Sequence, residues 1–397
     1  MRHPWRGVAV LGACALAATG CTVSNPLSTS TPSSHQSRGA HHARQVREAT
    51  PPPSLRMRPA PGTSVRWRAR PILVARHGSI TSVRMHARGH GAVHGSLQSD
   101  ARWQADKSEL VPGTHYRAVV RVHGDDGNTV TRHVRFTTSQ APRLSISATP
   151  GSGWTRGVGE TVKIYFNRPV TNRARVERHM RVTTSGGHIE GGWHWFSDSV
   201  AHFRPRHFWP AHTRVNVHID LAGLYVGHGV WGDRNHDWSW QVGDSHISYV
   251  NANTHRFRVT ANGHQVDNWP TGMGQPGFET RSGTYSVLDK LPTTVMDSCS
   301  VGLGCQETDP NYYKLTVHDD VRLTTSGTFV HAAPWDGQVG YANTSHGCVH
   351  LSTADAEQFY GMSMPGDVVI VKGTGRAANP DDPGMQDWSI PWSEWQN

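Results

Sequence analysis

One cysteine lies between two histidines in the segment TSHGCVH, which runs from Thr344 to His350. A third histidine, His331, lies upstream in the segment FVHAAPW. A free thiol is only a few per cent ionised at neutral pH, so a nucleophilic Cys348 needs a base or a positive charge nearby. His331, His346 and His350 are the candidates for that base.

The residue before this cysteine also matters for chemistry. Gly347 has no side chain, which would let a substrate carbonyl approach backbone N–H groups that can hold an oxyanion. If the segment is extended, His346, Cys348 and His350 project from one face, and such a face could also form a Cys-His-His metal site. No further Cys, Asp or Glu lies within the motif, so we predict a nucleophile rather than a metal site.

The remaining four cysteines lie far from this motif. Cys14 and Cys21 lie in an N-terminal segment with a basic start, a short apolar run and small residues, which predicts a secretory signal peptide over residues 1–21. The sequence ATGC resembles a lipobox, which predicts acylation of Cys21 and hence a membrane anchor; an ordinary signal cut elsewhere is the alternative. Cys299 and Cys305 lie close together, and such a pair can oxidise outside the cytoplasm.

The segment that follows the signal is rich in Ser, Thr, Pro and Arg. Because it contains few large apolar residues, we expect residues 22–64 to be a disordered tether. Residues 1–76 carry eleven Arg and one acidic residue, so we assign the net charge of +9 to the tether. Secretion removes nucleic acid as a partner, and anionic lipid or wall polymer is the more plausible contact for these charges.

Short alternating runs bounded by Gly, Pro, Asn and Asp dominate the rest of the chain and predict a mainly β protein. HYRAVVRVHG, TVTRHVRFTT, TVKIYFNRPV and RFRVTANG are examples, whereas RARVERHM and STADAEQFYGMS give the clearest helical signal. We predict immunoglobulin-like domains at 65–139 and 142–244, a third domain at 245–377 and a Trp-rich C-terminal segment at 378–397. Most of the 15 Trp are expected to pack in cores and between domains.

The motif residues resemble a known family. FVHAAPW, thirteen residues between His331 and Ser345, and then SHGC are similar to the catalytic signature of the YkuD-type L,D-transpeptidases, the cysteine enzymes of peptidoglycan. PTGMGQPGFETRSGTYSV, VMDS, NYYKLTV and DWSIPWSEWQ resemble the actinobacterial enzymes in which two immunoglobulin-like domains precede the catalytic domain. The resemblance implies a β-sandwich or barrel-like catalytic domain over 245–377.

Roles can be transferred to the positions that match the family motif. The resemblance implies that Cys348 is the nucleophile and that His331 is its base, oriented by the carbonyl of Ala332. His346 and Ser345 would shape the site, and the N–H groups of Gly347 and Cys348 would hold the oxyanion. The resemblance places the following further side chains around the substrate: Tyr313 beside the acyl group, Met296 in a flap over the channel, and Trp335 in the wall.

Two positions depart from the family pattern. His350 stands where Asn or Arg is usual, which changes the expected side-chain hydrogen bonds to substrate. Cys299 and Cys305 lie in the expected flap, where cysteines are not a family rule. We expect a disulfide between them to hold the flap and to narrow access to the thiol.

The resemblance implies a thioester acyl-enzyme that forms cross-links between diaminopimelate residues of two peptidoglycan stem peptides. It also implies acylation by β-lactams of the carbapenem type. An L,D-carboxypeptidase, with water in place of the acceptor amine, and a catalytically silent wall-binding lipoprotein are the alternatives. The expected location is the extracytoplasmic face of the cell membrane, lipid-anchored and reaching the cell wall.

Overall fold

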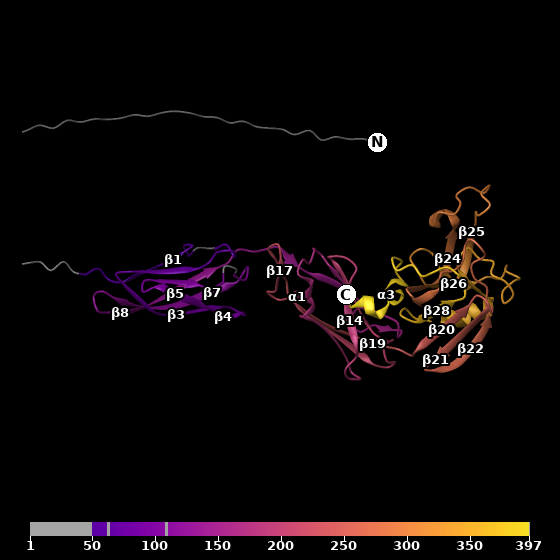
Figure 1. Ribbon diagram of the computed structural model, residues 1–397, viewed down its shortest axis with the longest axis horizontal. Coiled ribbons are helices and arrows are strands. Elements are labelled where there is room, and N and C mark those ends of the chain that lie inside the picture. Colours follow the sequence, from indigo (N-terminus) through magenta and orange to yellow (C-terminus); the bar gives the residue numbers. More distant parts are fainter. Residues whose placement is uncertain (1–49, 62–63, 108–109, 397) are drawn as a thin grey trace, which may run out of the picture. The chain divides into compact units, whose positions relative to one another are not determined.

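A computed structural model describes residues 50–61, 64–107 and 110–396 of the 397-residue chain. The predicted signal peptide, the predicted acylation site Cys21 and most of the predicted tether lie outside the described residues. Three groups of strands follow one another along the chain, coloured from indigo to yellow in Figure 1. The prediction of a mainly β protein is confirmed, and two β-sandwiches precede the third group of strands.

The first group forms a sandwich of two four-stranded sheets. One sheet has the order β1 (Ser54–Arg58), β2 (Ile72–Arg76), β6 (Arg102–Ala105), β5 (Gly95–Ser99), and the other β4 (Gly91–Val93), β3 (Gly78–Ala87), β7 (His115–Gly124), β8 (Thr129–Thr137). Alternate residues of β7 are buried, as the pattern HYRAVVRVHG predicts. Their side chains pack against Leu73 of β2 and Trp103 of β6 in one core.

The second group is also a sandwich, with a smaller third sheet. The orders are β10 (Ile146–Thr149), β12 (Val162–Phe166), β15 (Val200–Pro205), β14 (Gly191–Trp195); β11 (Thr155–Arg156), β19 (Asn235–Val242), β16 (Arg214–Asp220), β13 (Met180–Thr184); and β17 (Tyr225–Gly227), β18 (Val230–Gly232), β9 (Arg143–Leu144). Trp209 and Trp240 are fully buried in its core. For these two rings, packing is the observed role, as expected from the sequence.

The third group carries the catalytic motif. Its sheets have the orders β22 (His264–Pro270), β21 (Arg256–Ala261), β20 (His246–Asn251), β28 (Val368–Lys372), β23 (Gly283–Ser286), and β24 (Asp289–Asp297), β25 (Lys314–Arg322), β26 (Phe329–Ala332), β27 (Val349–Leu351). Helix α2 (Thr353–Met362) begins at Ser352, whose side chain accepts a hydrogen bond from the Asp355 N–H, as the Ser/Thr cap predicts. Phe359 of α2 packs into a core shared by both sheets.

The other helices are short. Helix α1 (Arg173–Glu177) lies in the segment RARVERHM, and the 3₁₀ helix η1 (Ser298–Val301) lies between β24 and β25. Helices α3 (Gln386–Ser389) and α4 (Trp392–Trp395) form the C-terminal segment. None of the helices in the described part of the chain is long and apolar enough to cross a membrane.

The C-terminal segment packs on the second sandwich, as its tryptophans suggest. The indole N–H of Trp388 donates to the Gly159 carbonyl at 2.8 Å, and that of Trp395 donates to the Gly192 carbonyl at 2.8 Å. The Arg204 guanidinium lies over the rings of Trp388, Trp392 and Trp395 at 4.9, 5.1 and 4.5 Å. Each such contact of a cation with an aromatic face stabilises the assembly by about 1 kcal/mol.

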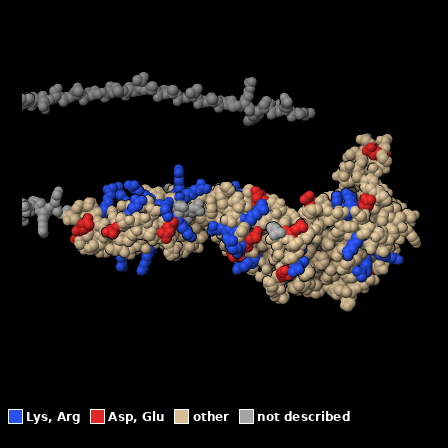
Figure 2. Space-filling model, viewed as in Figure 1, with Lys and Arg blue, Asp and Glu red and all other residues tan. Residues whose placement is uncertain are grey.

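One prediction about the tether is wrong. Strand β1 lies within residues 22–64 and pairs with β2 from Ser54↔Arg76 to Arg58↔Ile72, so the first domain begins before Val65. The segment around Leu55 and Met57 is Pro-rich, which predicts a spacer. It forms a strand because the edge of the sheet supplies hydrogen-bond partners for its backbone. Residues 54–139 hold fourteen Lys or Arg against five acidic residues, so much of the charge assigned to the tether belongs to a folded domain, over which Figure 2 shows many blue side chains.

Candidate active site

Parallel strands β26 and β27 bring the histidine and cysteine motifs together. Val330 pairs with Val349 and His331 with His350, so residues nearly twenty positions apart become neighbours in one sheet. Cys348 immediately precedes β27. His331 and Cys348 both line a cavity of about 500 Å³.

His331 is held in one orientation. Its side chain is buried, and Nδ1 lies 2.9 Å from the carbonyl oxygen of the next residue, Ala332. Because Nδ1 must carry the proton to donate to a carbonyl, Nε2 carries the lone pair. Burial, reinforced by the neighbouring His350, lowers the pKa of His331 to about 4. The geometry predicted for a base oriented by Ala332 is present.

The cysteine sulfur is also held. Cys348 Sγ donates to the carbonyl of Gly327 at 3.6 Å. Burial raises the pKa of the Cys348 thiol to about 11. The resting site therefore contains a neutral thiol and a neutral imidazole rather than an ion pair.

The loop before Cys348 differs from the extended segment expected from the sequence. Gly347 has φ of +128°, and β27 begins only at Val349, so the regular alternation through His346, Cys348 and His350 is broken. A hydrogen bond of 3.0 Å joins the Gly347 N–H to Ser345 Oγ. The prediction that Gly347 supplies an oxyanion N–H is therefore wrong for this conformation.

Two hydroxyl groups fix that loop. Ser345 Oγ donates to the Cys348 carbonyl at 2.7 Å while accepting from Gly347. Thr280 Oγ1 donates to the Gly347 carbonyl at 3.0 Å and accepts from the Gly274 N–H at 3.0 Å. Ser345 was predicted to shape the site, whereas nothing in the sequence singled out Thr280.

One side of the cavity is formed by the flap and the residues that contact it. Met296 of β24 and Tyr313 line the cavity, as predicted. The His346 ring lies 5.1 Å from the Tyr313 ring and 4.9 Å from that of Phe278. Burial, with smaller contributions from Cys348 and Asp297, raises the pKa of Tyr313 to about 12, so its hydroxyl keeps its proton at neutral pH.

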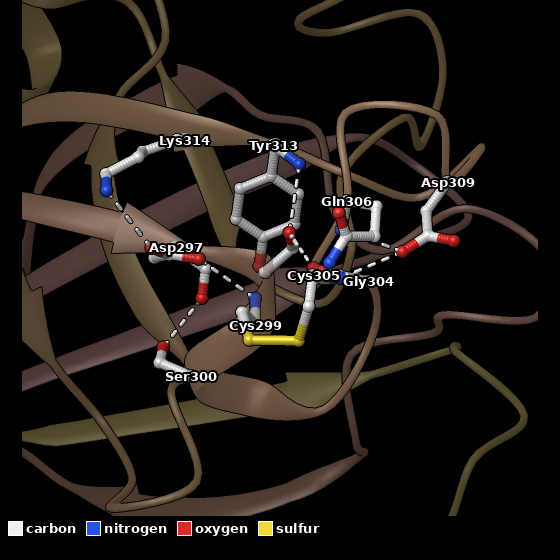
Figure 3. Close-up of a disulfide and its surroundings, with 10 residues drawn as sticks. Asp297, Cys299, Ser300, Gly304, Cys305, Gln306, Asp309, Tyr313 and Lys314 are labelled. Carbon is white, nitrogen blue, oxygen red and sulfur yellow. Dashed lines mark hydrogen bonds and ion pairs between the residues drawn. A yellow bond between two sulfur atoms is a disulfide. The ribbon is translucent and has the colours of Figure 1, made fainter.

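The flap loop is closed by the expected disulfide between Cys299 and Cys305. Figure 3 shows the disulfide in the same loop as Tyr313 and Asp297, whose side chain accepts from the Cys299 N–H at 3.0 Å. Asp309 accepts from the N–H groups of Cys305 and Gln306 at 2.9 and 3.0 Å. The six-residue separation between the cysteines leaves a small ring, two of whose residues, Val301 and Leu303, line the cavity.

His350 and Trp335 also line the cavity. Nδ1 of His350 lies 2.6 Å from Asp336 Oδ2, which also accepts a hydrogen bond from Thr344 Oγ1 at 2.6 Å. The His350 ring packs edge-on against the His331 ring at 4.9 Å. Trp335 is 49% exposed and lies 6.1 Å from the His331 ring, which fits the predicted wall residue.

The C-terminal segment supports the loop that holds the sulfur. Asp382 accepts hydrogen bonds from Thr325 Oγ1, at 3.2 Å, and from Ser326 Oγ. These residues directly precede Gly327, whose carbonyl accepts from Cys348. Cys348 is thus positioned by the loop from β25 to β26 and, through it, by residues far along the chain.

No group of three or more His, Cys, Asp or Glu side chains in the described residues is arranged to hold a metal ion. The nearest approach to such a set in the motif was His346, Cys348 and His350. In the structure His350 is bonded to Asp336, whereas His346 contacts the rings of Phe278 and Tyr313.

Comparison with known proteins agrees with this geometry. Residues 245–371 match the L,D-transpeptidase catalytic domain, and residues 63–225 match a bacterial Ig domain. The chain is 30% identical over 364 residues to L,D-transpeptidase 5 of Mycobacterium tuberculosis, covering 88% of this chain and 78% of that protein. The chain belongs to the L,D-transpeptidase family.

Other members of the family are similarly related. L,D-transpeptidase 2 of Mycobacterium tuberculosis is 35% identical over 272 residues, which cover 68% of this chain and 66% of that protein. A solved structure of the LD transpeptidase LdtMt1 in complex with imipenem is 33% identical, with a TM-score of 0.50, and is matched over 58% of this chain and 99% of that one.

Several residues that shape this L,D-transpeptidase site were missed from the sequence. Asp336 directly follows FVHAAPW, and an acidic residue beside a histidine motif is a signal that could have been used. Gly327, Thr280 and Asp382 carry no such local signal, because each acts through a contact with a distant segment.

Proposed function

We propose that the chain is an L,D-transpeptidase that cross-links peptidoglycan stem peptides through a thioester on Cys348. One observation carries this proposal: parallel strands place His331, with Nδ1 bonded to the Ala332 carbonyl, and Cys348 on one cavity. A nucleophile and an oriented base in a shared cavity are the parts that acyl transfer requires.

The first half-reaction begins from the neutral pair. With the thiol pKa near 11 and the imidazole pKa near 4, ionisation at rest is strongly unfavourable. The proton therefore passes from Sγ to Nε2 of His331 as sulfur attacks the carbonyl of the donor's L,D peptide bond. The C–N bond then breaks, and His331 gives the proton to the departing D-amino acid.

The oxyanion of this step needs donors other than the Gly347 N–H. The Cys348 N–H remains the backbone candidate, as the family resemblance implies. The Tyr313 hydroxyl keeps its proton and lines the same cavity, so it is the side-chain candidate.

The second half-reaction releases the enzyme. The side-chain amine of a second stem attacks the thioester, the C–N bond forms and the C–S bond breaks. By family resemblance, both linked residues are diaminopimelate. Carbapenem-type β-lactams are proposed to acylate the same sulfur, in keeping with the imipenem complex of a relative.

The test is incubation of the folded chain with a tetrapeptide stem, followed by mass analysis of the products. A cross-linked dimer is expected, with loss of the terminal D-amino acid. Trimmed tripeptide alone would instead identify an L,D-carboxypeptidase. If the chain is folded by circular dichroism yet gains no mass with imipenem, it is a silent wall-binding protein and the proposal fails.

We also propose that Cys21 is diacylated and that the enzyme works at the extracytoplasmic face of the membrane. A thioether-linked diacylglycerol is a stable anchor because two chains bind a bilayer far more firmly than one. Mass spectrometry of the mature N-terminus tests this: a lipid-modified Cys21 is expected, and an unmodified N-terminus at another residue contradicts it.

A further inference from the structure

We propose that His350, oriented by Asp336, is the base that deprotonates the acceptor amine in the second half-reaction. The inference rests on the proposed transpeptidase function and adds a second acid–base group to it. His331 would then accept the proton of the Cys348 thiol, and His350 would accept a proton from the amine of the incoming stem peptide.

The geometry is that of an oriented base. Asp336 Oδ2 lies 2.6 Å from Nδ1 of His350 and also accepts from Thr344 Oγ1, so the carboxylate is fixed from two sides. Nδ1 donates to the carboxylate, which leaves the lone pair on Nε2. Nε2 makes no hydrogen bond to any residue that the structure describes, and His350 lines the cavity.

The charges of the pair suit a cation. Burial lowers the pKa of His350 despite the opposing effect of Asp336, so the ring is neutral at neutral pH. Burial acts to raise the pKa of Asp336, but the hydrogen bonds from His350 and Thr344 outweigh it and hold that pKa below its usual value. The pair therefore carries one negative charge, which attracts an ammonium group and repels the donor's terminal carboxylate.

The position of the pair fits the acceptor rather than the donor. Tyr313 and Met296, which are assigned to the acyl group and its cover, lie on the flap side with His346. His350 and Trp335 instead contact His331 and each other. An amine that reaches the thioester along the rings of Trp335 and His331 meets His350.

The proton balance of the second half-reaction gives such a group a task. An amine with a pKa of about 10.4 arrives as an ammonium ion and cannot attack until it loses a proton. His350 Nε2 accepts that proton and later releases it to solvent, and the neutral amine then forms the C–N bond. The second proton of the amine passes through His331 to the sulfur that leaves, which restores the thiol.

Other titratable groups face His350 and separate the two bases. His331, His346 and Asp336 interact with it, and a charge on His350 lowers the pKa of both other histidines. Cys348 lies two residues away in the chain and is neutral at rest. Protonated His350 therefore opposes protonation of His331, so His350 releases its proton to solvent before His331 passes the second proton to the sulfur.

The test compares His350→Asn with the unsubstituted full chain. Asn is the residue that the family often has here, and it can still bond to Asp336 but cannot take a proton. A tetrapeptide donor and a tripeptide acceptor ending in diaminopimelate are incubated between pH 6 and 10, and dimer formation is measured beside acylation by imipenem. At pH 7 we expect His350→Asn to lower dimer formation about a hundredfold and to lower acylation far less. The difference in dimer formation between the variant and the unsubstituted chain should shrink as the pH approaches the pKa of the amine.

A matched control is present in the second sandwich. His218 Nδ1 lies 2.6 Å from Asp237 Oδ1 in an exposed pair outside the cavity, so His218→Asn removes the same kind of pair and should leave the dimer yield unchanged. Asp336→Asn keeps a hydrogen-bond acceptor for His350 but removes the charge, and should shift the pH profile in the same direction. Added imidazole should restore dimer formation to His350→Ala and not to His331→Ala.

The outcomes are distinct. Equal losses of acylation and dimer formation, or an unchanged pH profile in His350→Asn, would mean that His350 only supports the fold of the site, and the inference fails. Failure of imidazole to rescue His350→Ala, if that variant is folded by circular dichroism, also overturns it. Absence of imipenem acylation in the unsubstituted chain would overturn the proposed function itself and this inference with it.

Discussion

The same three residue types, Thr, Asp and His, meet in two regions of this protein. In the cavity, Asp336 accepts from Thr344 Oγ1 at 2.6 Å and lies 2.6 Å from Nδ1 of His350. Where the C-terminal segment meets the second sandwich, Asp387 accepts from Thr161 Oγ1 at 2.6 Å and lies 2.7 Å from Nδ1 of His202.

The two Thr-Asp-His trios differ in the surroundings of the histidine Nε2. Nε2 of His202 is buried without a hydrogen-bond partner, and the ring packs against those of Phe196 and Tyr165. His350 lines an open cavity beside His331. The same hydrogen bonds therefore hold a protein interface together in one place and orient a base in the other, and access to solvent and ligand decides between these roles.

The largest effect on acylation is expected from a substitution in the cavity, and it tests which histidine takes the proton of Cys348. His331→Ala should slow acylation by imipenem at least about a thousandfold, because it removes the base that takes the proton of Cys348. His350→Asn should slow that step much less. The measurement is the rate of mass increase with imipenem, and equal losses would show that the wrong imidazole has been assigned.

A substitution in the enclosed trio of Thr161, Asp387 and His202 should instead lower the free energy of unfolding. Asp387→Ala leaves His202 and the nearby Lys163 without their carboxylate, and breaking a buried pair of this kind costs about 3–5 kcal/mol. Denaturant unfolding of this variant measures the loss. Asp336→Ala is the comparison: it should lower dimer formation more than stability, and the reverse order for the two substitutions would contradict the distinction.

Acid should weaken the enclosed trio in a defined range. Burial acts to raise the pKa of Asp387, but His202, Lys163 and Thr161 hold it at about 2. A carboxyl whose pKa is depressed on folding stabilises the protein above its unfolded pKa of about 3.9, and this contribution of about 2 kcal/mol is lost as pH falls through 2. Unfolding between pH 5 and 2 should therefore be less pH-dependent in Asp387→Asn, and an unchanged slope would count against this assignment.

The smallest effect is expected at the flap. The double substitution Cys299→Ser and Cys305→Ser removes the disulfide that closes a small ring. Loss of this cross-link costs about 2 kcal/mol by loop entropy, and it affects the flap loop rather than either trio. We expect faster imipenem acylation because Val301 and Leu303 are less confined over the cavity. Non-reducing mass spectrometry of the unsubstituted chain should show one disulfide, and slower acylation in the double variant would refute the idea that it narrows access.

Residues within the motif were predictable from the sequence, and their partners were not. The alternating runs predicted the strands, and the resemblance of the segment from His331 to Cys348 to the family motif predicted two residues that line one cavity. The Gly347 N–H was misassigned because its bond to Ser345 depends on the left-handed backbone of the loop.

Long-range pairs were beyond the reach of local patterns. Asp387 and His202 are 185 residues apart, and Asp336 reaches His350 only because β26 and β27 pair. Strand β1 was missed because its sequence is Pro-rich, and only the partner strand makes it extended. In each case the deciding interaction lies in the tertiary structure rather than in the segment itself.

The C-terminal tryptophans have a consequence for the order in which the molecule is assembled. Trp395 is 203 residues from Gly192, and Trp388 is 229 residues from Gly159. Ribosomes add about 5–20 residues per second. Strand β19 completes the second sandwich at Val242, so the sandwich then waits roughly 7–30 s for the indoles that cover Arg204. During that interval a newly made sandwich exposes Arg204, Phe196 and Phe208, which contact the tryptophans in the complete chain. A chain interrupted before helix α3 would leave these side chains open to quality-control proteases.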